Sequence, residues 1–301
     1  MSTIVFFCIP AYGHTNPTLG VVRELAARGH KVVYYSYDTM RKPIEAAGAA
    51  FVSCNAYDAE QRLSPKDGER LGRDLAFSTQ VLVDTTLALD NAILSDMRAL
   101  APDCIVADSM ALWGKLIAKK LDIPFVSSTT TFAFNRYSAK IMKQSPAQLF
   151  GMLVSMPKIG REIKRLQAAG YPVKSVLDII QNDENLDTIV YTSPEFQPCA
   201  DTFPAAHYAF VGPSIRPAEM RMEKSAQPLV YISLGTVVND QLAFYQQCVA
   251  ALADGPCRVI LSIGEQVKPA ALGTLPGNVE VHAHVDQIAV LQIADVFLTH
   301  C

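Results

Sequence analysis

The sequence lacks several of the signatures that would define a function directly. None of its seven cysteines are spaced as C-x-x-C, and no D-x-D pair or cluster of histidines suggests a set of metal ligands. The motif G-x-G-x-x-G and the P-loop are also missing, so NAD binding and nucleotide hydrolysis lose their usual sequence support. These absences indicate a reduced, cytoplasmic protein that works without a metal ion or another cofactor.

Charge and hydropathy exclude further classes. The net charge is -3, and no Lys/Arg-rich run offers an electrostatic footprint for nucleic acid or an acidic membrane surface. No apolar stretch has the length of a transmembrane segment, and the apolar run Ile4 to Ile9 lacks the flanks of a signal peptide. Since half of the 301 residues are hydrophobic, the chain can bury the cores of two domains. Small-molecule chemistry is therefore the expected function.

Short β-branched or aromatic runs alternate with longer segments of helical spacing. Strands that are apolar on both faces and separated by helices are typical of a parallel sheet covered on both sides, which is the doubly wound α/β class. The predicted helices are Pro17 to Arg28, Ala111 to Lys120 and Leu242 to Leu252. The predicted strands are Ile4 to Ile9, Lys31 to Ser36, Cys104 to Ala107, Phe125 to Ser128, Thr188 to Tyr191, Tyr208 to Val211, Leu229 to Ser233, Arg258 to Ser262, Val279 to His282 and Val296 to Thr299.

Two segments interrupt this alternation. Residues 136–185 have a helical composition but contain Pro146, Pro157 and Pro172, which predicts several short helices rather than one. Residues 214–228 are polar and charged without an apolar period, which is typical of a linker. The chain is therefore predicted to have an N-terminal domain at 1–213 and a second, partial domain at 229–301.

A histidine and an aspartate are expected to meet at the edge of the first sheet. His14 follows the first strand, and Asp108 follows the strand Cys104 to Ala107. With the usual strand order 3-2-1-4-5, these two strands are neighbours, and their carboxyl ends face one crevice. A neutral imidazole oriented by a carboxylate can remove the proton of a hydroxyl. The alternative is that His14 is a plain loop residue and Asp108 an N-cap for a helix beginning at Ser109.

Hydroxyl-rich segments follow two other strands. Residues 127–131 read S-S-T-T-T, and residues 233–236 read S-L-G-T. Small hydroxyl residues and glycine let the backbone approach a phosphate, although the same residues also cap helices and form turns.

The motifs together resemble the macrolide-glycosyltransferase branch of the UDP-glycosyltransferases, in the same order and spacing along essentially the whole chain. The residues that carry the resemblance are P-A-Y-G-H-T-N-P-T-L, A-D-S-M-A-L-W-G-K, F-V-G-P-S, I-S-L-G-T and V-D-Q-I-A-V-L-Q-I-A-D-V-F-L-T-H-C. The resemblance implies the GT-B fold, with an acceptor domain followed by a donor domain. It also implies inverting transfer of a hexose from a UDP-sugar to a hydroxyl of a small hydrophobic acceptor, such as a macrolide or flavonoid, by a monomer or weak dimer.

The resemblance also assigns roles to individual residues. It implies that His14 is the general base and Asp108 its partner. The donor-binding residues that it implies are Gly13, Thr130 and Thr131 in the first domain and Gly235, Thr236, Val285, Gln287 and His300 in the second. The acceptor pocket is expected from residues 61–86 and 136–185.

Two departures from the family pattern bear on function. Asp286 stands where the family usually has proline, which adds negative charge near the expected anionic donor. The family also continues beyond T-H-C into a glycine-rich turn and a helix that meets the phosphates, so the sequence is expected to be truncated and weak in donor binding. A non-catalytic accessory protein derived from a glycosyltransferase is therefore the alternative, and an epimerase on the same architecture is a third possibility.

Overall fold

The computed structural model describes residues 1–55, 70, 74–138, 146–175, 185–215, 217–218, 220–236 and 239–300. The chain divides into two compact units, Met1–Ile215 and Arg216–Cys301, and each contains its own sheet. The assignment of residues 214–228 as a linker between domains stays a prediction.

The first unit is built on a seven-stranded sheet with the order β3-β2-β1-β4-β5-β6-β7, in which all neighbouring strands are parallel. This order contains the expected 3-2-1-4-5 arrangement, with β1 and β4 side by side. The strands are β1 (Thr3–Phe7), β2 (Lys31–Ser36), β3 (Ala50–Ser53), β4 (Cys104–Asp108), β5 (Phe125–Thr129), β6 (Thr188–Val190) and β7 (Tyr208–Phe210).

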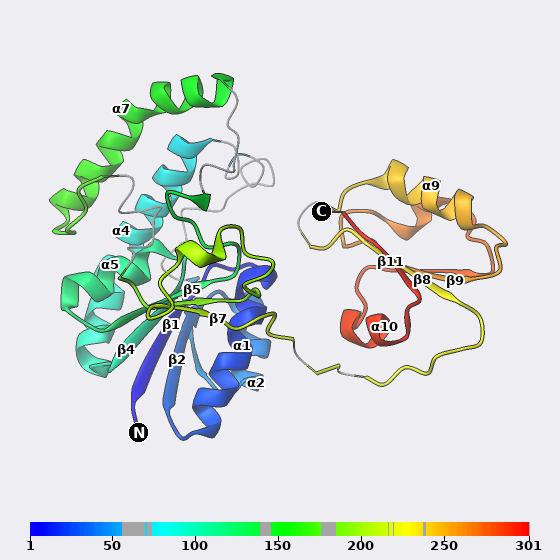
Figure 1. Cartoon of the computed structure of the whole chain (residues 1–301), viewed down its shortest axis with the longest axis horizontal. Helices are drawn as coiled ribbons and strands as arrows, with labels where there is room; N and C mark the ends of the chain where they lie inside the picture. Colours follow the sequence, from blue (N-terminus) through cyan, green and yellow to red (C-terminus); the bar gives the residue numbers. More distant parts are fainter. Residues whose placement is uncertain are drawn as a thin grey trace. The chain divides into compact units, whose positions relative to one another are not determined.

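Helices cover both faces of this sheet (Figure 1). Val5 and Phe7 of β1 belong to a core with α4 (Leu75–Leu100) and α5 (Leu112–Leu121). The alternate residues of β1 belong to a second core with α1 (Tyr12–Ala27) and α2 (Arg41–Ala46). Because successive strand side chains point to opposite faces, one apolar run supplies both cores, as the doubly wound class requires.

Helix α1 begins earlier than the sequence predicted. The helix starts at Tyr12 rather than Pro17, so Pro17 lies inside it. The amide of Thr15 already donates to the carbonyl oxygen of Ala11 at 2.9 Å, which closes one turn before Pro17. This difference places His14 in the first turn of a helix instead of in a loop.

Helix α7 (Pro146–Ala168) corrects another expectation, because it runs through Pro157 without a break. Its buried residues, including Ile159 and Leu166, pack with Ala76 and Val83 of α4. This packing offsets the amide hydrogen bond that proline cannot make.

The second unit has a four-stranded parallel sheet with the order β10-β9-β8-β11. Its strands are β8 (Leu229–Ser233), β9 (Arg258–Ser262), β10 (Val279–His282) and β11 (Val296–Leu298), and its helices are α9 (Leu242–Leu252) and α10 (Gln287–Ile293). Residues of α9 and α10 belong to two different cores of this sheet, so helices cover both of its faces as well.

Candidate active site

The carboxyl ends of three adjacent strands of the first unit carry the predicted catalytic residues. Asp108 is the last residue of β4 and lies opposite Ser128 of β5 in the strand register. The chain leaves the neighbouring strand β1 at Phe7 and enters α1, whose first turn holds Gly13 and His14. Thr130 directly follows β5.

The structure brings His14 and Asp108 together across 94 positions of the sequence. Nδ1 of His14 lies 2.9 Å from Oδ1 of Asp108, and the two side chains are 20% and 0% exposed. An ionised carboxylate only accepts hydrogen bonds, so the proton of the neutral imidazole lies on Nδ1. Nε2 then keeps its lone pair, which is the form that a general base needs.

The second oxygen of Asp108 has a local role. Oδ2 accepts a hydrogen bond from the amide of Met110 at 3.3 Å, while helix α5 begins only at Leu112. Asp108 is therefore not the N-cap of a helix starting at Ser109. Two donors, the imidazole and one backbone amide, compensate a carboxylate whose side chain is completely buried.

Thr130 contacts the same imidazole nitrogen. Its Oγ1 lies 3.0 Å from Nδ1 of His14, so this nitrogen lies next to both a carboxylate and a hydroxyl. When Nδ1 carries the proton, the oxygen of Thr130 is a second acceptor, and its own hydroxyl proton can be donated elsewhere. Thr131 is exposed, and its hydroxyl donates to the carbonyl oxygen of Phe132 at 3.4 Å.

The negative charge of Asp108 acts on three further side chains, Cys8, Tyr34 and Tyr191. Burial raises the pKa of the Cys8 thiol well above its ordinary value, and the negative charge of Asp108 adds to this shift. Burial likewise raises the pKa of Tyr34, and it raises the pKa of Tyr191 to about 12. These groups keep their protons at neutral pH, so none of them is a base at that pH.

In the second unit, three of the predicted donor residues lie at neighbouring strand ends. Gly235 and Thr236 follow β8, and His300 follows the adjacent strand β11. A Cβ atom built on Gly235 would lie 4.0 Å from Cε1 of His300. The amide of Gly235 donates to Oγ of Ser233 at 3.3 Å, and its φ of 74° is in the region that favours glycine.

Asn239 supports this loop and was missed by the sequence analysis. Its Nδ2 donates to the carbonyl oxygen of Gly235 at 3.0 Å, and the residue is 4% exposed. A Cβ atom on Gly264 would lie 2.3 Å from the same Nδ2, so this glycine makes room for the amide. Asn239 belongs to none of the sequence motifs and therefore gave no signal in the sequence. Its role depends on contacts with Gly235 and Gly264, which follow different strands.

Val285 and Gln287 lie at a different strand end. Gln287 is the first residue of α10 and follows β10, which is separated from β8 by β9. Val285 packs against a core cluster, whereas Gln287 is exposed. Between them, Oδ2 of Asp286 accepts a hydrogen bond from the amide of Met220 at 3.1 Å, so its carboxylate has a structural partner.

Other site expectations are only partly covered by the structure. Residues 61–69, 71–73, 139–145 and 176–184 of the expected acceptor-pocket segments lie outside the described residues.

Among the residues that the structure describes, no group of three or more His, Cys, Asp or Glu could hold a metal ion. No helix within the described ranges combines the length and apolar character needed to cross a membrane.

Known proteins with similar sequences are glycosyltransferases. The chain is 30% identical to a protein called uncharacterized UDP-glucosyltransferase YojK from Bacillus subtilis (strain 168), covering 100% of this chain and 75% of the relative. It is 31% identical to demethyllactenocin mycarosyltransferase from Streptomyces fradiae, covering 100% of this chain and 67% of the relative. No protein-family model matches the sequence.

Solved structures agree with the sequence comparison. The chain is similar to CalG4, the calicheamicin glycosyltransferase, with a TM-score of 0.74 and 30% identity over 100% of this chain and 74% of the other. The two parallel α/β units thus have the GT-B fold, as predicted. The chain belongs to the UDP-glycosyltransferases, which confirms the family indicated by its motifs and makes this protein an enzyme of that class.

Proposed function

We propose that this protein transfers a hexose from a UDP-sugar to a hydroxyl group of a small hydrophobic acceptor, with inversion at the anomeric carbon. Membership of the family supports glycosyl transfer, and the names of relatives such as the mycarosyltransferase suggest natural-product acceptors. The observation that carries the proposal is the contact of 2.9 Å between His14 and Asp108 at adjacent strand ends. The enzyme uses no metal ion or other cofactor and acts in the cytoplasm, as a monomer or weak dimer.

His14 acts as the general base in this proposal. Its Nε2 removes the proton of the acceptor hydroxyl while Asp108 stabilises the imidazolium that forms. The acceptor oxygen bonds to the anomeric carbon as the bond to the diphosphate oxygen breaks, and UDP leaves with the electron pair. Gly13, Thr130 and Thr131 lie near the transferred sugar.

The second unit holds the leaving group. Gly235, Thr236 and His300 bind the diphosphate, and Val285 and Gln287 hold the uracil and ribose. The support for this assignment is that Gly235 and His300 lie next to one another at the ends of β8 and β11. Backbone amides and an imidazole placed there would stabilise negative charge as it develops on the diphosphate.

The first experiment compares two histidines that both pair with aspartates. His14→Ala should lower transfer from UDP-glucose to a phenolic or macrolide acceptor by about 10²- to 10⁴-fold, because the general base is lost. The control is His207→Ala, because Nδ1 of His207 lies 2.8 Å from Oδ1 of Asp187. Asp187 precedes β6 and His207 precedes β7, so this pair lies at the amino-terminal ends of the strands, whereas His14 and Asp108 lie at the carboxyl ends. Activity of His14→Ala near that of the wild type would contradict the proposal.

A second measurement separates the enzyme from an accessory protein. UDP should bind saturably when protein fluorescence is followed during a titration, and His14→Ala should bind it with unchanged affinity because the base lies in the other unit. No binding at millimolar UDP, together with no transfer by the wild type, would favour the accessory role.

A further inference from the structure

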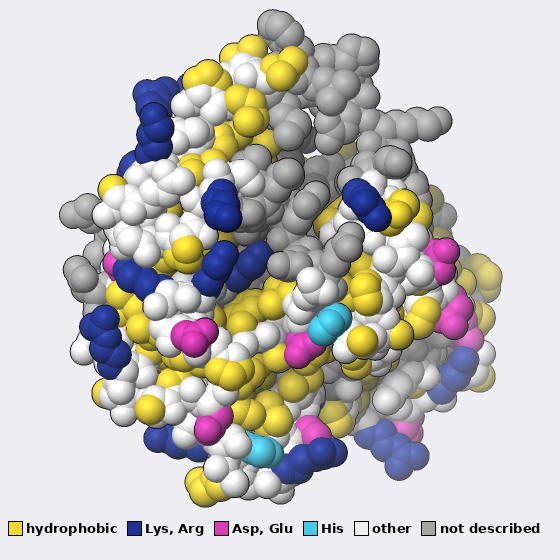
Figure 2. All heavy atoms as spheres, turned by 60° about the vertical axis from the view of Figure 1, so that its left-hand side comes forward, with side chains coloured by type: hydrophobic (Ala, Val, Ile, Leu, Met, Phe, Trp, Pro, Cys, Tyr) yellow, Lys and Arg dark blue, Asp and Glu magenta, His cyan; other side chains and the backbone are white. Residues whose placement is uncertain are grey.

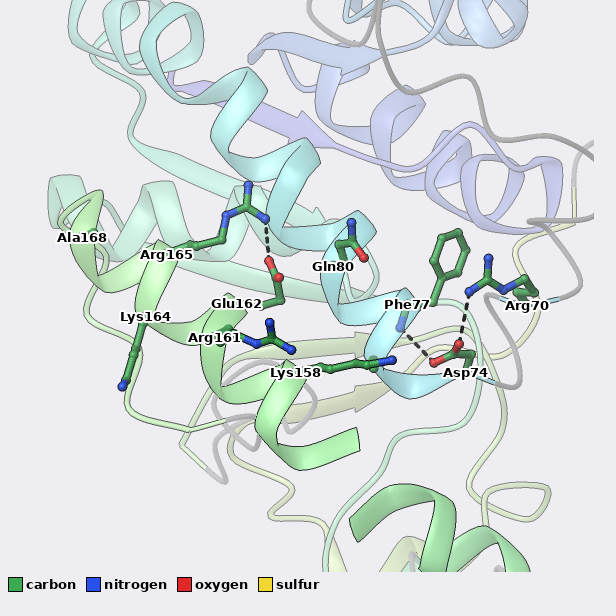
Figure 3. A pocket seen from close by; sticks show the side chains of 11 residues that line it. Arg70, Asp74, Phe77, Gln80, Lys158, Arg161, Glu162, Lys164, Arg165 and Ala168 are labelled. Carbon is green, nitrogen blue, oxygen red and sulfur yellow. Dashed lines mark hydrogen bonds and ion pairs between the residues drawn. The ribbon is translucent and has the colours of Figure 1, made fainter. Parts of the chain in front are cut away.

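A groove between α4 and α7 has the composition of an anion-binding site, and none of its lining residues was assigned a role in the transfer step above. Its volume is about 670 Å³, which is within the range of small-molecule sites. The lining contains five cationic side chains and two carboxylates, which gives a local formal charge of +3 in a protein whose net charge is -3. Figure 3 shows Lys158 and Arg161 of α7 on the side of this helix that faces Gln80 and Phe77 of α4.

The two carboxylates of the groove are already engaged. Asp74 accepts hydrogen bonds from the amide of Phe77 at 3.0 Å and from Arg70 at 3.3 Å. Glu162 lies 2.6 Å from Nη1 of Arg165, and the same nitrogen lies 2.6 Å from Asp84 of α4. These pairs compensate Arg70 and Arg165, so neither arginine is the main source of the excess positive charge.

Arg161 and Lys164 carry the uncompensated charge. Both are exposed residues of α7, and neither has an ion-pair partner among the residues that the structure describes. Lys158 adds a third cation, which acts on Asp74 electrostatically. On the face drawn in Figure 2, Lys and Arg side chains gather in the upper left with few Asp or Glu among them.

The groove also has an apolar side. Ala76, Phe77 and Ala168 contribute to its lining. The guanidinium of Arg70 lies over the ring of Phe77 at 4.0 Å and forms a flat wall. Free cations beside an aromatic surface suit a ligand that combines an anionic group with a flat apolar body, because guanidinium binds carboxylate and phosphate in a planar, bidentate manner.

We propose that the α4–α7 groove binds a small organic anion, an aromatic carboxylate or phosphate ester, with Lys158 and Arg161 holding the anionic group against Phe77. The lining residues fall within residues 61–86 and 136–185, from which the acceptor pocket is expected, and none of them is among the contacts of His14 described above. An anionic membrane surface is the competing partner for the same cations. The groove favours the small molecule because its aromatic wall and two paired carboxylates lie alongside the free cations.

The test uses three matched probes with the whole chain. 2-Naphthoate and 1-naphthyl phosphate should bind in isothermal titration calorimetry, and the neutral 2-naphthalenemethanol should bind at least tenfold more weakly. The double variant Lys158→Ala/Arg161→Ala should lose at least tenfold in affinity for both anions. These side chains are exposed, so the variant should fold normally, which circular dichroism checks.

Two controls define the outcomes. Lys42→Ala/Lys268→Ala removes two exposed cations elsewhere and should leave the affinities unchanged, as should His14→Ala. Equal affinity of charged and neutral probes, or equal losses in the two double variants, would overturn the proposal. Failure of the naphthyl anions to bind, with cosedimentation on phosphatidylglycerol vesicles that requires Lys158 and Arg161, would instead assign the groove to a membrane surface.

Discussion

At the scale of single residues, the arrangement around Nδ1 of His14 predicts that Thr130 positions the imidazole. The imidazole nitrogen lies 2.9 Å from Asp108 and 3.0 Å from Thr130. Two acceptors on one side of the ring hold Nε2 toward the opposite side. In the proposed mechanism, a hydroxyl in this position also stabilises the imidazolium that forms when His14 takes up the acceptor proton.

Thr130→Val should therefore lower kcat about tenfold, since one hydrogen bond to a charged group is lost, while KM for the UDP-sugar changes little. Thr130→Ser keeps the hydroxyl and should retain most of the activity. Steady-state kinetics of both variants separate the two roles. A rise in KM for the sugar at unchanged kcat would show that Thr130 acts on the donor rather than on His14.

At the scale of secondary-structure elements, helix α4 depends on its N-cap. Oδ1 of Asp74 accepts the amide hydrogen of Phe77, and Asp74→Ala should destabilise the first unit by about 1 kcal/mol. Asp74→Asn keeps a capping oxygen and should lose much less. Urea unfolding followed by circular dichroism measures both changes.

The contribution of Asp74 depends on pH in a defined direction. The hydrogen bond from the Phe77 amide is the main cause that lowers the pKa of Asp74 below its ordinary value of 3.8. A lowered pKa in the folded state means that the stabilisation is present above pH 3.8 and is lost as the pH falls through the folded-state value. The stability difference between wild type and Asp74→Ala should therefore shrink in acid, and a difference that grows below pH 3.8 would contradict this account.

The loop after β8 can be tested through its support. Gly264→Ala places a Cβ atom 2.3 Å from Nδ2 of Asn239, which should displace the Gly235 loop and weaken UDP binding. Gly273→Ala is the matched control, because its φ of 81° is strained for alanine while no atom lies within 4 Å of the new Cβ. Both variants should lose about 1 kcal/mol of stability from backbone strain, and only Gly264→Ala should lose UDP affinity. Equal UDP affinities would remove Asn239 from the donor site.

At the scale of the whole molecule, two compact units with separate cores should unfold separately. Ile105→Ala empties a fully buried position in the first unit, and Leu261→Ala does the same in the second. Each should destabilise its own unit by about 2 to 5 kcal/mol. Differential scanning calorimetry should show one transition shifted in each variant, whereas equal shifts of the whole profile would show that the units unfold together.

Several elements could be predicted from local pattern, and others could not. The bounds of β2, β8, β9, β10 and α9 agree with the sequence prediction, because each is an apolar run between clear turn signals. The start of α1 and the continuity of α7 through Pro157 could not be predicted, since tertiary packing overrides the local effect of proline. Strand β3 and helix α4 were not predicted either.

The sequence by itself determined the doubly wound class, the family and the identity of His14 and Asp108 as a candidate pair. Apolar runs that alternate with helices, and short motifs in a fixed order, are properties of the chain alone. Only the tertiary structure decided that Nδ1 of His14 contacts both Asp108 and Thr130, that Asn239 supports Gly235, and that the cations of α7 line a groove with α4. These contacts join residues on different strands and helices, and their distances depend on how the helices pack on each sheet.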